Sequence, residues 1–283
     1  MNHRPDTFIL FLRKLREISS ASVAPRMFSR LLRSLIKRLV RFGPTRVNNF
    51  TYSIYGVWLY DKWEDATFRF CATGAYGFFY SDWLSRIEKC TFIDIGANLG
   101  LYSLLAAKNP AVHKIYAFEP QPEIYNSLTI NLGKNQANRV TAFPHAISNT
   151  TEESELQIKE GHSGAATLRD HVVSEKTFVK RIKISKVDHS FLDEKIIIDP
   201  EEKICIKIDT EGHEEQVLRE LMKTKFWRNV TNIFYEVDER YIDQQKILHL
   251  LQEHGFSIIY KNGEQPHYDL MLERKSIQET SSA

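Results

Sequence analysis

The sequence predicts an α/β fold, a mostly parallel β-sheet wrapped by helices. From residue 90 onward, short segments rich in Ile, Val and Phe alternate with segments of helical periodicity, as they do in repeated strand–helix–strand units. Near the end of the chain the apolar segments 256–260 and 268–272 follow each other without a helix between them, which indicates an antiparallel hairpin on that sheet. The composition, 42% hydrophobic and 26% charged, is that of an ordinary globular protein.

We expect five strands before that hairpin, and four helices between and after them. The strands are expected at 91–95, 114–118, 140–144, 204–208 and 232–235. The helices are expected at 101–107, 122–132, 213–222 and 242–253. Residues 150–200 form a long insertion with strand-like pieces at 156–159 and 179–187. The loop of the hairpin is expected to open with Lys261, Asn262 and Gly263.

Residues 1–46 are set apart by their charge. They carry 11 Lys or Arg against Asp6 and Glu17, a net charge of +9, which leaves the rest of the chain at −7. Within them, 27–42 has apolar residues on one side of a predicted helix and basic residues on the other. Three interpretations are open: a helix packed on the domain, a peripheral contact with an anionic membrane surface, and a cleavable transit peptide.

The chain is expected to divide at Gly43 and Pro44, which end this helix. The predicted parts are a basic amphipathic segment at 1–46, a β-rich lead-in at 47–89, the main domain at 90–275 and a disordered tail at 276–283. In the aromatic-rich lead-in, we expect Phe68 and Phe70 to belong to short strands and turns that could cover one edge of the main domain.

The cysteines and the charge distribution limit the classes of protein. Cys71, Cys90 and Cys205 lie far apart without a Cys-x-x-Cys pair, which predicts buried single thiols in a reducing compartment, hence a cytoplasmic protein, with membrane association as the open alternative. No apolar run approaches the roughly 20 residues of a membrane span. Because the chain beyond residue 46 is acidic and carries no recognised nucleic-acid motif, we expect no nucleic-acid partner.

The first candidate site follows the strand at 91–95. Ligands of open α/β sheets bind beyond the carboxyl ends of the strands, and Gly96 and Gly100 permit a positive φ and a close approach of the backbone to a ligand. Asn98 takes the place of the second glycine of the dinucleotide fingerprint. The turn therefore favours a nucleoside ligand without phosphates.

An acidic residue ends the next strand. Glu119 comes about 20 residues after the glycine turn, where a carboxylate can accept hydrogen bonds from both hydroxyls of a ribose. A solvated strand-end acid and an N-cap of the following helix are the alternatives.

The fourth strand brings Asp209 to the same edge of the sheet. Lys207, Asp209 and Glu211 alternate in sequence, so on a regular strand they would share a face. Asp209 is best placed to bind a substrate hydroxyl or to help remove its proton, and Glu211 and His213 complete the candidate catalytic set. The same three side chains could also hold a divalent cation, although we assign no metal. Glu214, in contrast, reads as a first-turn acid without a function.

Together these segments resemble the FkbM family of S-adenosylmethionine-dependent methyltransferases. The resemblance is carried by residues 92–103, by Ala-Phe-Glu-Pro at 117–120 and by Lys-Ile-Asp-Thr-Glu-Gly at 207–212, and it covers roughly residues 75–275. It implies a Rossmann-like, seven-stranded class I methyltransferase sheet whose last two strands are the hairpin. It also implies O-methylation of a sugar, glycan or polyketide-like acceptor.

The resemblance also implies the residues that bind S-adenosyl-L-methionine. Those around its methionine part would be Asp94, Gly96, Ala97, Asn98 and Gly100. Glu119, followed by Pro120, would hold the ribose, and His145 and Ala146 would border the adenine. Two other functions stay open, an NAD(P)-binding Rossmann oxidoreductase and a non-catalytic cofactor-binding subunit tethered to a membrane.

Overall fold

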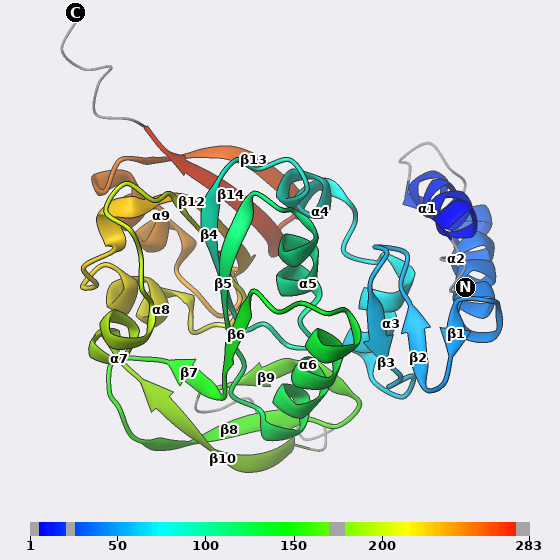
Figure 1. The fold of residues 1–283 in the computed structure, drawn as a ribbon, viewed down its shortest axis with the longest axis horizontal. Helices are drawn as coiled ribbons and strands as arrows, with labels where there is room; N and C mark the ends of the chain where they lie inside the picture. The colour runs from blue at the N-terminus through cyan, green and yellow to red at the C-terminus, as the bar shows by residue number, and fades with distance from the viewer. Residues whose placement is uncertain (1–5, 21–25, 170–178, 276–283) are drawn as a thin grey trace, which may run out of the picture.

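A seven-stranded mixed sheet forms the centre of the protein. The computed structural model describes residues 6–20, 26–169 and 179–275. The strand order is β13–β14–β12–β11–β4–β5–β6 (Figure 1). The bounds of these strands are β4 (Cys90–Ile95), β5 (Val112–Phe118), β6 (Val140–Phe143), β11 (Ile204–Ile208), β12 (Val230–Asp238), β13 (Phe256–Glu264) and β14 (His267–Arg274). β6, β5, β4, β11 and β12 pair with one another in parallel, whereas β14 pairs antiparallel with both β12 and β13.

The strand order reverses at the centre of this sheet: from β4 the chain continues to β5 and β6 on one side, and it then returns to β11 and β12 on the other. β4 pairs with β5 on one side and with β11 on the other. Every residue of β4 and β11 is buried, as expected for central strands of a parallel sheet with both faces covered. The crevice between their carboxyl ends is therefore the position at which such sheets bind ligands.

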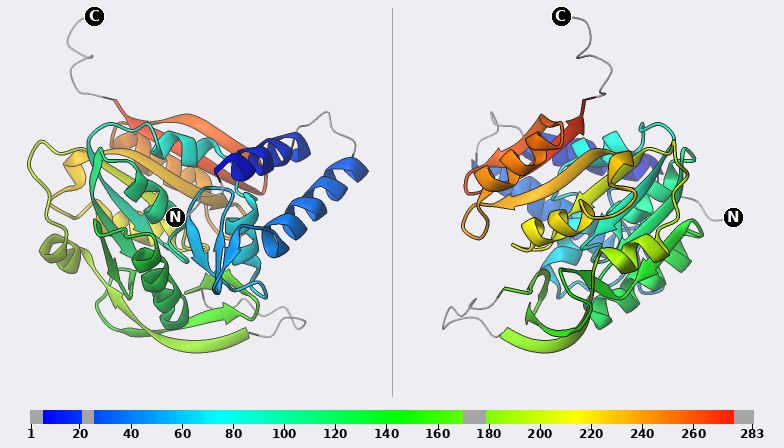
Figure 2. Two further views of the ribbon diagram at one scale, coloured as in Figure 1. Left: turned by 45° about the vertical axis from the view of Figure 1, so that its right-hand side comes forward. Right: turned by 90° about the vertical axis from the view of Figure 1, so that its left-hand side faces the viewer.

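Helices cover both faces of the sheet (Figures 1 and 2). One face carries α4 (Phe79–Leu84), α5 (Leu101–Lys108) and α6 (Pro122–Lys134), and the other carries α7 (His189–Lys195), α8 (Glu214–Leu221) and α9 (Gln244–Glu253). Because side chains alternate along a strand, Phe92 packs into one core cluster and its neighbour Ile93 into the other. The predicted strands and helices of the main domain are thus confirmed to within a few residues, except at the hairpin.

The predicted hairpin loop is wrong. Lys261, Asn262 and Gly263 lie within β13, where they pair with β14, and the chain reverses at Gln265 and Pro266. Lys261, Asn262 and Gly263 lie opposite Leu270, Asp269 and Tyr268 of β14, so the register of the hairpin carries β13 past its predicted end.

The insertion, together with the preceding strand β7, folds into a second sheet of order β7–β10–β8–β9 beside the main one. Its strands are β7 (His145–Ile147), β8 (Glu153–Lys159), β9 (His162–Thr167) and β10 (Val179–Val187). β8 and β10 are the two predicted pieces, whereas β9 and α7 were not predicted. Residues 170–178 of the insertion, and the predicted disordered tail at 276–283, lie outside the described residues.

The lead-in is only partly β-structure. It contains a sheet of β1 (Arg46–Val47), β2 (Phe50–Tyr52) and β3 (Trp58–Tyr60), followed by α3 (Ala66–Thr73) and α4. Phe68 and Phe70 lie in α3, contrary to the expectation. The Asp65 side chain caps the start of this helix by accepting from the Phe68 N–H, and Gly74 ends it with a φ of 71°. These two capping residues favour a helix despite the aromatic composition between them.

Two helices form the basic front end. The predicted helix is α2 (Arg26–Phe42), and α1 (Asp6–Ser20), which was not predicted, packs beside it. Ile36 and Val40 of α2 are completely buried, so one side of the helix packs on the protein. None of the helices in the described part of the chain is long and apolar enough to cross a bilayer. Cys71, Cys90 and Cys205 are buried and free, as predicted.

Candidate functional site

A cavity of about 380 Å³ lies at the carboxyl ends of β4, β5 and β11, within the usual range for small-molecule sites. Ten of the twelve predicted site residues line it. They are Gly96, Ala97, Asn98, Glu119, Pro120, His145, Ala146, Asp209, Glu211 and His213. Segments predicted from three separate strand ends therefore meet around one cavity.

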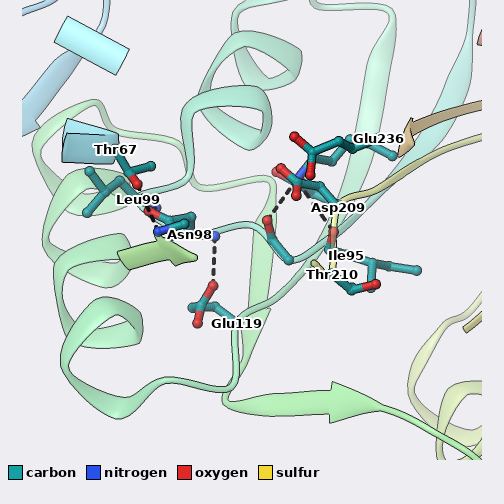
Figure 3. A network of polar contacts seen from close by, with 12 residues as sticks. Thr67, Ile95, Asn98, Leu99, Glu119, Asp209, Thr210 and Glu236 are labelled. Atoms are coloured by element: carbon teal, nitrogen blue, oxygen red, sulfur yellow. Dashed lines mark hydrogen bonds and ion pairs between the residues drawn. The ribbon is translucent and has the colours of Figure 1, made fainter. Parts of the chain in front are cut away.

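Glu119 holds the glycine turn in place. One carboxylate oxygen accepts from the Asn98 backbone N–H at 2.8 Å (Figure 3). The other accepts from the Gln121 N–H at 2.8 Å. Burial raises the pKa of Glu119 to about 7, against the opposing effect of these two hydrogen bonds. Its side chain is neither solvated nor the N-cap of α6, which is Gln121. Because each carboxylate oxygen has a second lone pair, Glu119 can still accept from a ligand in the cavity.

Two residues that the resemblance places around the cofactor, Asp94 and Gly100, are not among those that line the cavity. The Asp94 carboxylate is fully buried and accepts from the backbone N–H and the hydroxyl of Ser103, at 3.0 and 2.7 Å, so it anchors α5 to β4. Gly100 has a φ of 83°, and a Cβ there would lie 2.4 Å from Leu128 Cδ1 of α6. Both residues therefore support the turn through contacts with helices α5 and α6.

Lys207 ties the tips of β4 and β11 together. This side chain is only 3% exposed, and its Nζ donates to the Gly96 carbonyl at 2.7 Å. The same Nζ lies 3.3 Å from an oxygen of Asp209 and 3.6 Å from one of Asp94. Burial opposes the charge of Lys207, but these two carboxylates outweigh it and raise its pKa. The ammonium group therefore orients the Asp209 carboxylate at the cavity wall. Alternation along the strand predicted only that the two side chains share a face.

Asp209 lies in a cluster with two other carboxylates. Oxygens of Asp209, Glu211 and Glu236 come within 4.8 Å of one another, and Figure 3 shows Glu236 directly beside Asp209. Burial, followed by the neighbouring negative charges, raises the pKa of Glu211 to about 9 and that of Glu236 to about 8. This spacing of oxygen ligands is compatible with a cation, and the raised pKa values show that protons can neutralise the cluster as well.

The chain reaches this cluster by a route that strand alternation did not predict. β11 ends at Ile208, and Glu211 has a φ of 53°, so a turn and not the strand brings it beside Asp209. Glu214, expected to have no function, fixes that turn: its buried carboxylate accepts from Thr210 and from the Gly212 N–H, at 3.0 and 3.1 Å.

Glu236 was missing from the predicted site. It lies in β12, which continues to Asp238 and is parallel to β11. Its position at the end of an apolar strand was the available signal. His267 of β14 places Nε2 2.7 Å from a Glu236 oxygen, and this hydrogen bond raises the pKa of His267 to about 8.

His213 lines the cavity but does not join the carboxylates. Its Nε2 lies 3.1 Å from the Ser148 hydroxyl, and burial lowers its pKa to about 4, so the ring is neutral at pH 7. Of the three side chains that could hold a divalent cation, only Asp209 and Glu211 therefore lie close together, and the third carboxylate beside them is Glu236.

The far wall comes from the lead-in and the insertion. Thr67, Phe70 and Tyr76 line the cavity from the first, and residues 162–166 of β9 line it from the second. Tyr241 closes the wall, with the Arg169 guanidinium 3.4 Å above its ring. The lead-in and the insertion therefore both contribute to the wall of the cavity.

Residues 94–258, more than half of the chain, match the Methyltransferase FkbM domain family. The protein belongs to the FkbM methyltransferase family. This match confirms the resemblance seen in the sequence. It does not favour the NAD(P)-dependent oxidoreductase or the non-catalytic subunit.

Individual relatives of this FkbM domain are distant. The chain is 29% identical over 193 residues to methyltransferase sdnD of Sordaria araneosa, an alignment that covers 59% of this chain and 73% of that protein. Among solved structures it is similar to M. capricolum TrmK in complex with S-adenosyl-homocysteine, with 11% identity, a TM-score of 0.42 and coverage of 70% and 69% of the two chains. It is also similar to precorrin-6y C5,15-methyltransferase of Geobacter metallireducens GS-15, with 15% identity, a TM-score of 0.39 and coverage of 69% and 85%.

Proposed function

We propose that this FkbM domain transfers a methyl group from S-adenosyl-L-methionine to a hydroxyl oxygen of a sugar, glycan or polyketide-like acceptor. The observation that carries the proposal is the arrangement of the cavity. The glycine turn and Glu119 line one side of it, and the Lys207-bound carboxylate of Asp209 lines the side next to it.

The residues on the first side fit an adenosyl group. Glu119 has acceptor capacity left after its two backbone hydrogen bonds and would hold the ribose hydroxyls. His145 Nδ1 has no hydrogen-bond partner among the described residues, and this ring borders the position that we assign to the adenine. Gly96, Ala97 and Asn98 would border the methionine part.

The residues on the other side would bind the acceptor and take up its proton. The bound sulfonium supplies an activated methyl group, so the protein's main task is to align the acceptor oxygen with that group. As the C–O bond forms and the C–S bond breaks, the bonding pair stays on sulfur and the hydroxyl proton passes to the Asp209 carboxylate. Lys207 keeps this carboxylate oriented toward the cavity.

The composition of the acceptor side supports a neutral, hydroxyl-bearing acceptor. Three carboxylates offer acceptors for hydroxyl protons, and Phe70 and Tyr76 offer flat apolar surfaces. A nucleic-acid acceptor stays disfavoured, because its phosphates would meet the net charge of −7 beyond residue 46.

Two measurements test the proposed function. Calorimetry with S-adenosyl-homocysteine and with NAD should show binding of the first only. Incubation with methyl-labelled S-adenosyl-L-methionine and a glycan- or polyketide-containing extract should place label on oxygen. Label found only on nitrogen or carbon would refute the O-methyl assignment, and binding of NAD alone would refute methyl transfer itself.

A further inference from the structure

The front end of the protein concentrates exposed apolar side chains. Sixteen large apolar side chains are exposed in the described residues, and half of them lie in α1 and α2, which are only 15 and 17 residues long. These eight are Leu10, Phe11, Ile18, Met27, Phe28, Leu31, Leu35 and Phe42. An exposed apolar concentration of this kind marks an interaction surface.

On α2 the exposed residues form a stripe separate from the buried side. Phe28, Leu31, Leu35 and Phe42 recur at helical spacing, and their exposed fractions are 47%, 63%, 46% and 73%. Ile36, on a different side of the helix, is completely buried. Packing on the domain therefore accounts for one apolar side of α2 and leaves the adjacent one in solvent.

Basic residues border this stripe without internal partners. α1 and α2 together carry nine Lys or Arg against Asp6 and Glu17. Arg30, Arg33, Lys37 and Arg38 are exposed, and no carboxylate of the described residues forms an ion pair with them. Long basic side chains beside an apolar stripe can reach the headgroups while the stripe enters the acyl boundary.

The two helices are held firmly to the domain. Arg13 of α1 forms an ion pair with Asp82 of α4, and the Arg16 Nε donates to the Gly74 carbonyl at 3.1 Å. Both helices lie at one end of the molecule, beyond α3 and the small sheet of the lead-in (Figure 2). The stripe is thus presented by a fixed platform at the periphery of the protein.

We infer that the α1–α2 pair binds the surface of a bilayer that contains anionic lipid. Residues of the exposed stripe enter the apolar boundary, and Arg30, Arg33, Lys37 and Arg38 bind the headgroups. Lipid fits better than a protein partner, because a purely apolar contact would not require a surplus of unpaired cations. The helices lie on the membrane and do not cross it, in keeping with their length and charge.

Flotation of the full chain with vesicles tests this inference. The protein should float with phosphatidylcholine–phosphatidylserine vesicles and bind at least about tenfold more weakly to phosphatidylcholine alone or at high salt. Equal binding to both vesicle types, or none to either, would overturn the inference.

Matched variants separate the stripe from general surface hydrophobicity. Phe28→Ser, Leu31→Ser and Leu35→Ser combined, or Arg30→Gln, Arg33→Gln, Lys37→Gln and Arg38→Gln combined, should weaken vesicle binding at least about tenfold. The control, Ile197→Ser with Ile258→Ser, removes side chains that are 68% and 44% exposed elsewhere and should bind like the original. All variants alter exposed residues, so an unchanged melting temperature verifies the fold. If the apolar variant instead abolishes self-association in sedimentation and leaves vesicle binding intact, the surface joins protein copies and the inference fails.

Discussion

The carbonyl oxygen of Asp209 occupies the space that a side chain on Gly96 would need. A Cβ built on Gly96 would lie 1.8 Å from that oxygen, and the residue has a φ of +71°. The Asp209 backbone N–H also donates to the Ile95 carbonyl at 3.1 Å. The proposed base and the proposed cofactor turn are thus in direct backbone contact, and the glycine is required for that contact.

Gly96→Ala should separate the tips of β4 and β11. We expect a loss of unfolding free energy of at least ~2 kcal/mol and no measurable binding of S-adenosyl-homocysteine, because the turn must move. Thermal unfolding and calorimetry measure the two effects. The control is Gly133→Ala, where a Cβ would meet nothing within 4 Å inside α6, so stability should be unchanged or slightly higher. A fully stable Gly96→Ala protein that still binds the ligand would contradict the geometry.

Glu119→Gln should weaken cofactor binding. The amide NH₂ group would face one of the two backbone N–H donors that Glu119 now accepts. We expect affinity for S-adenosyl-homocysteine to fall at least about tenfold in calorimetry. Glu123→Gln, which alters a carboxylate whose side chain is 75% exposed, is the control and should leave the affinity intact. An equal loss in both variants would remove Glu119 from the ribose role.

Asp209→Asn should separate chemistry from binding. We expect turnover to fall about 10²- to 10⁴-fold, because the amide cannot accept the hydroxyl proton, while the affinity for S-adenosyl-homocysteine stays within a few-fold. Transfer of labelled methyl groups measures the first quantity and calorimetry the second. Asp199→Asn, at a side chain that is 76% exposed, should behave as the unaltered protein. Normal turnover of Asp209→Asn would show that another group takes up the hydroxyl proton. The neighbouring Glu236 would then be the next candidate.

The free protein should become less stable as the pH rises. Burial and mutual repulsion raise the folded-state pKa of Glu211 to about 9 and of Glu236 to about 8, above the ordinary 4.5. The folded state therefore binds more protons than the unfolded state in this range, and stability falls with pH. The contribution of these groups is fully present below about pH 4.5 and is lost as the pH passes through about 8 to 9.

A melting-temperature series from about pH 5 to about pH 9 measures this effect. The double variant Glu211→Gln, Glu236→Gln should flatten the decline, since neither amide titrates. A decline of the same slope in the double variant would place its origin elsewhere in the protein.

Methyl transfer should survive chelation. Protons, Lys207 and the His267 hydrogen bond to Glu236 can balance the three carboxylates without a divalent cation. We expect turnover within about twofold of the original after dialysis against EDTA. A loss of activity that Mg²⁺ restores would instead show that Asp209, Glu211 and Glu236 hold a cation.

From the amino-acid sequence alone, the main sheet and ten of the residues that line the cavity could be predicted. Short segments rich in Ile, such as 204–208, are typical of buried strands, and parallel strands place their carboxyl ends at one edge. Glu119 and Asp209 could therefore be assigned to one site from their positions after such segments. The same local reasoning located α2 and the two pieces of the insertion that became β8 and β10.

The tertiary structure decided which of these groups meet. Glu236 lies near Asp209 because β12 is the neighbour of β11 in the sheet. Glu211 lies near them because its own φ is positive, a conformation that alternation along a strand does not predict. Asp94 and Gly100 face helices instead of the cavity, since a motif does not reveal on which side of the turn the helices pack. Lastly, only packing showed that one apolar side of α2 is buried and the adjacent one is open, because periodicity reports that a side is apolar and not what covers it.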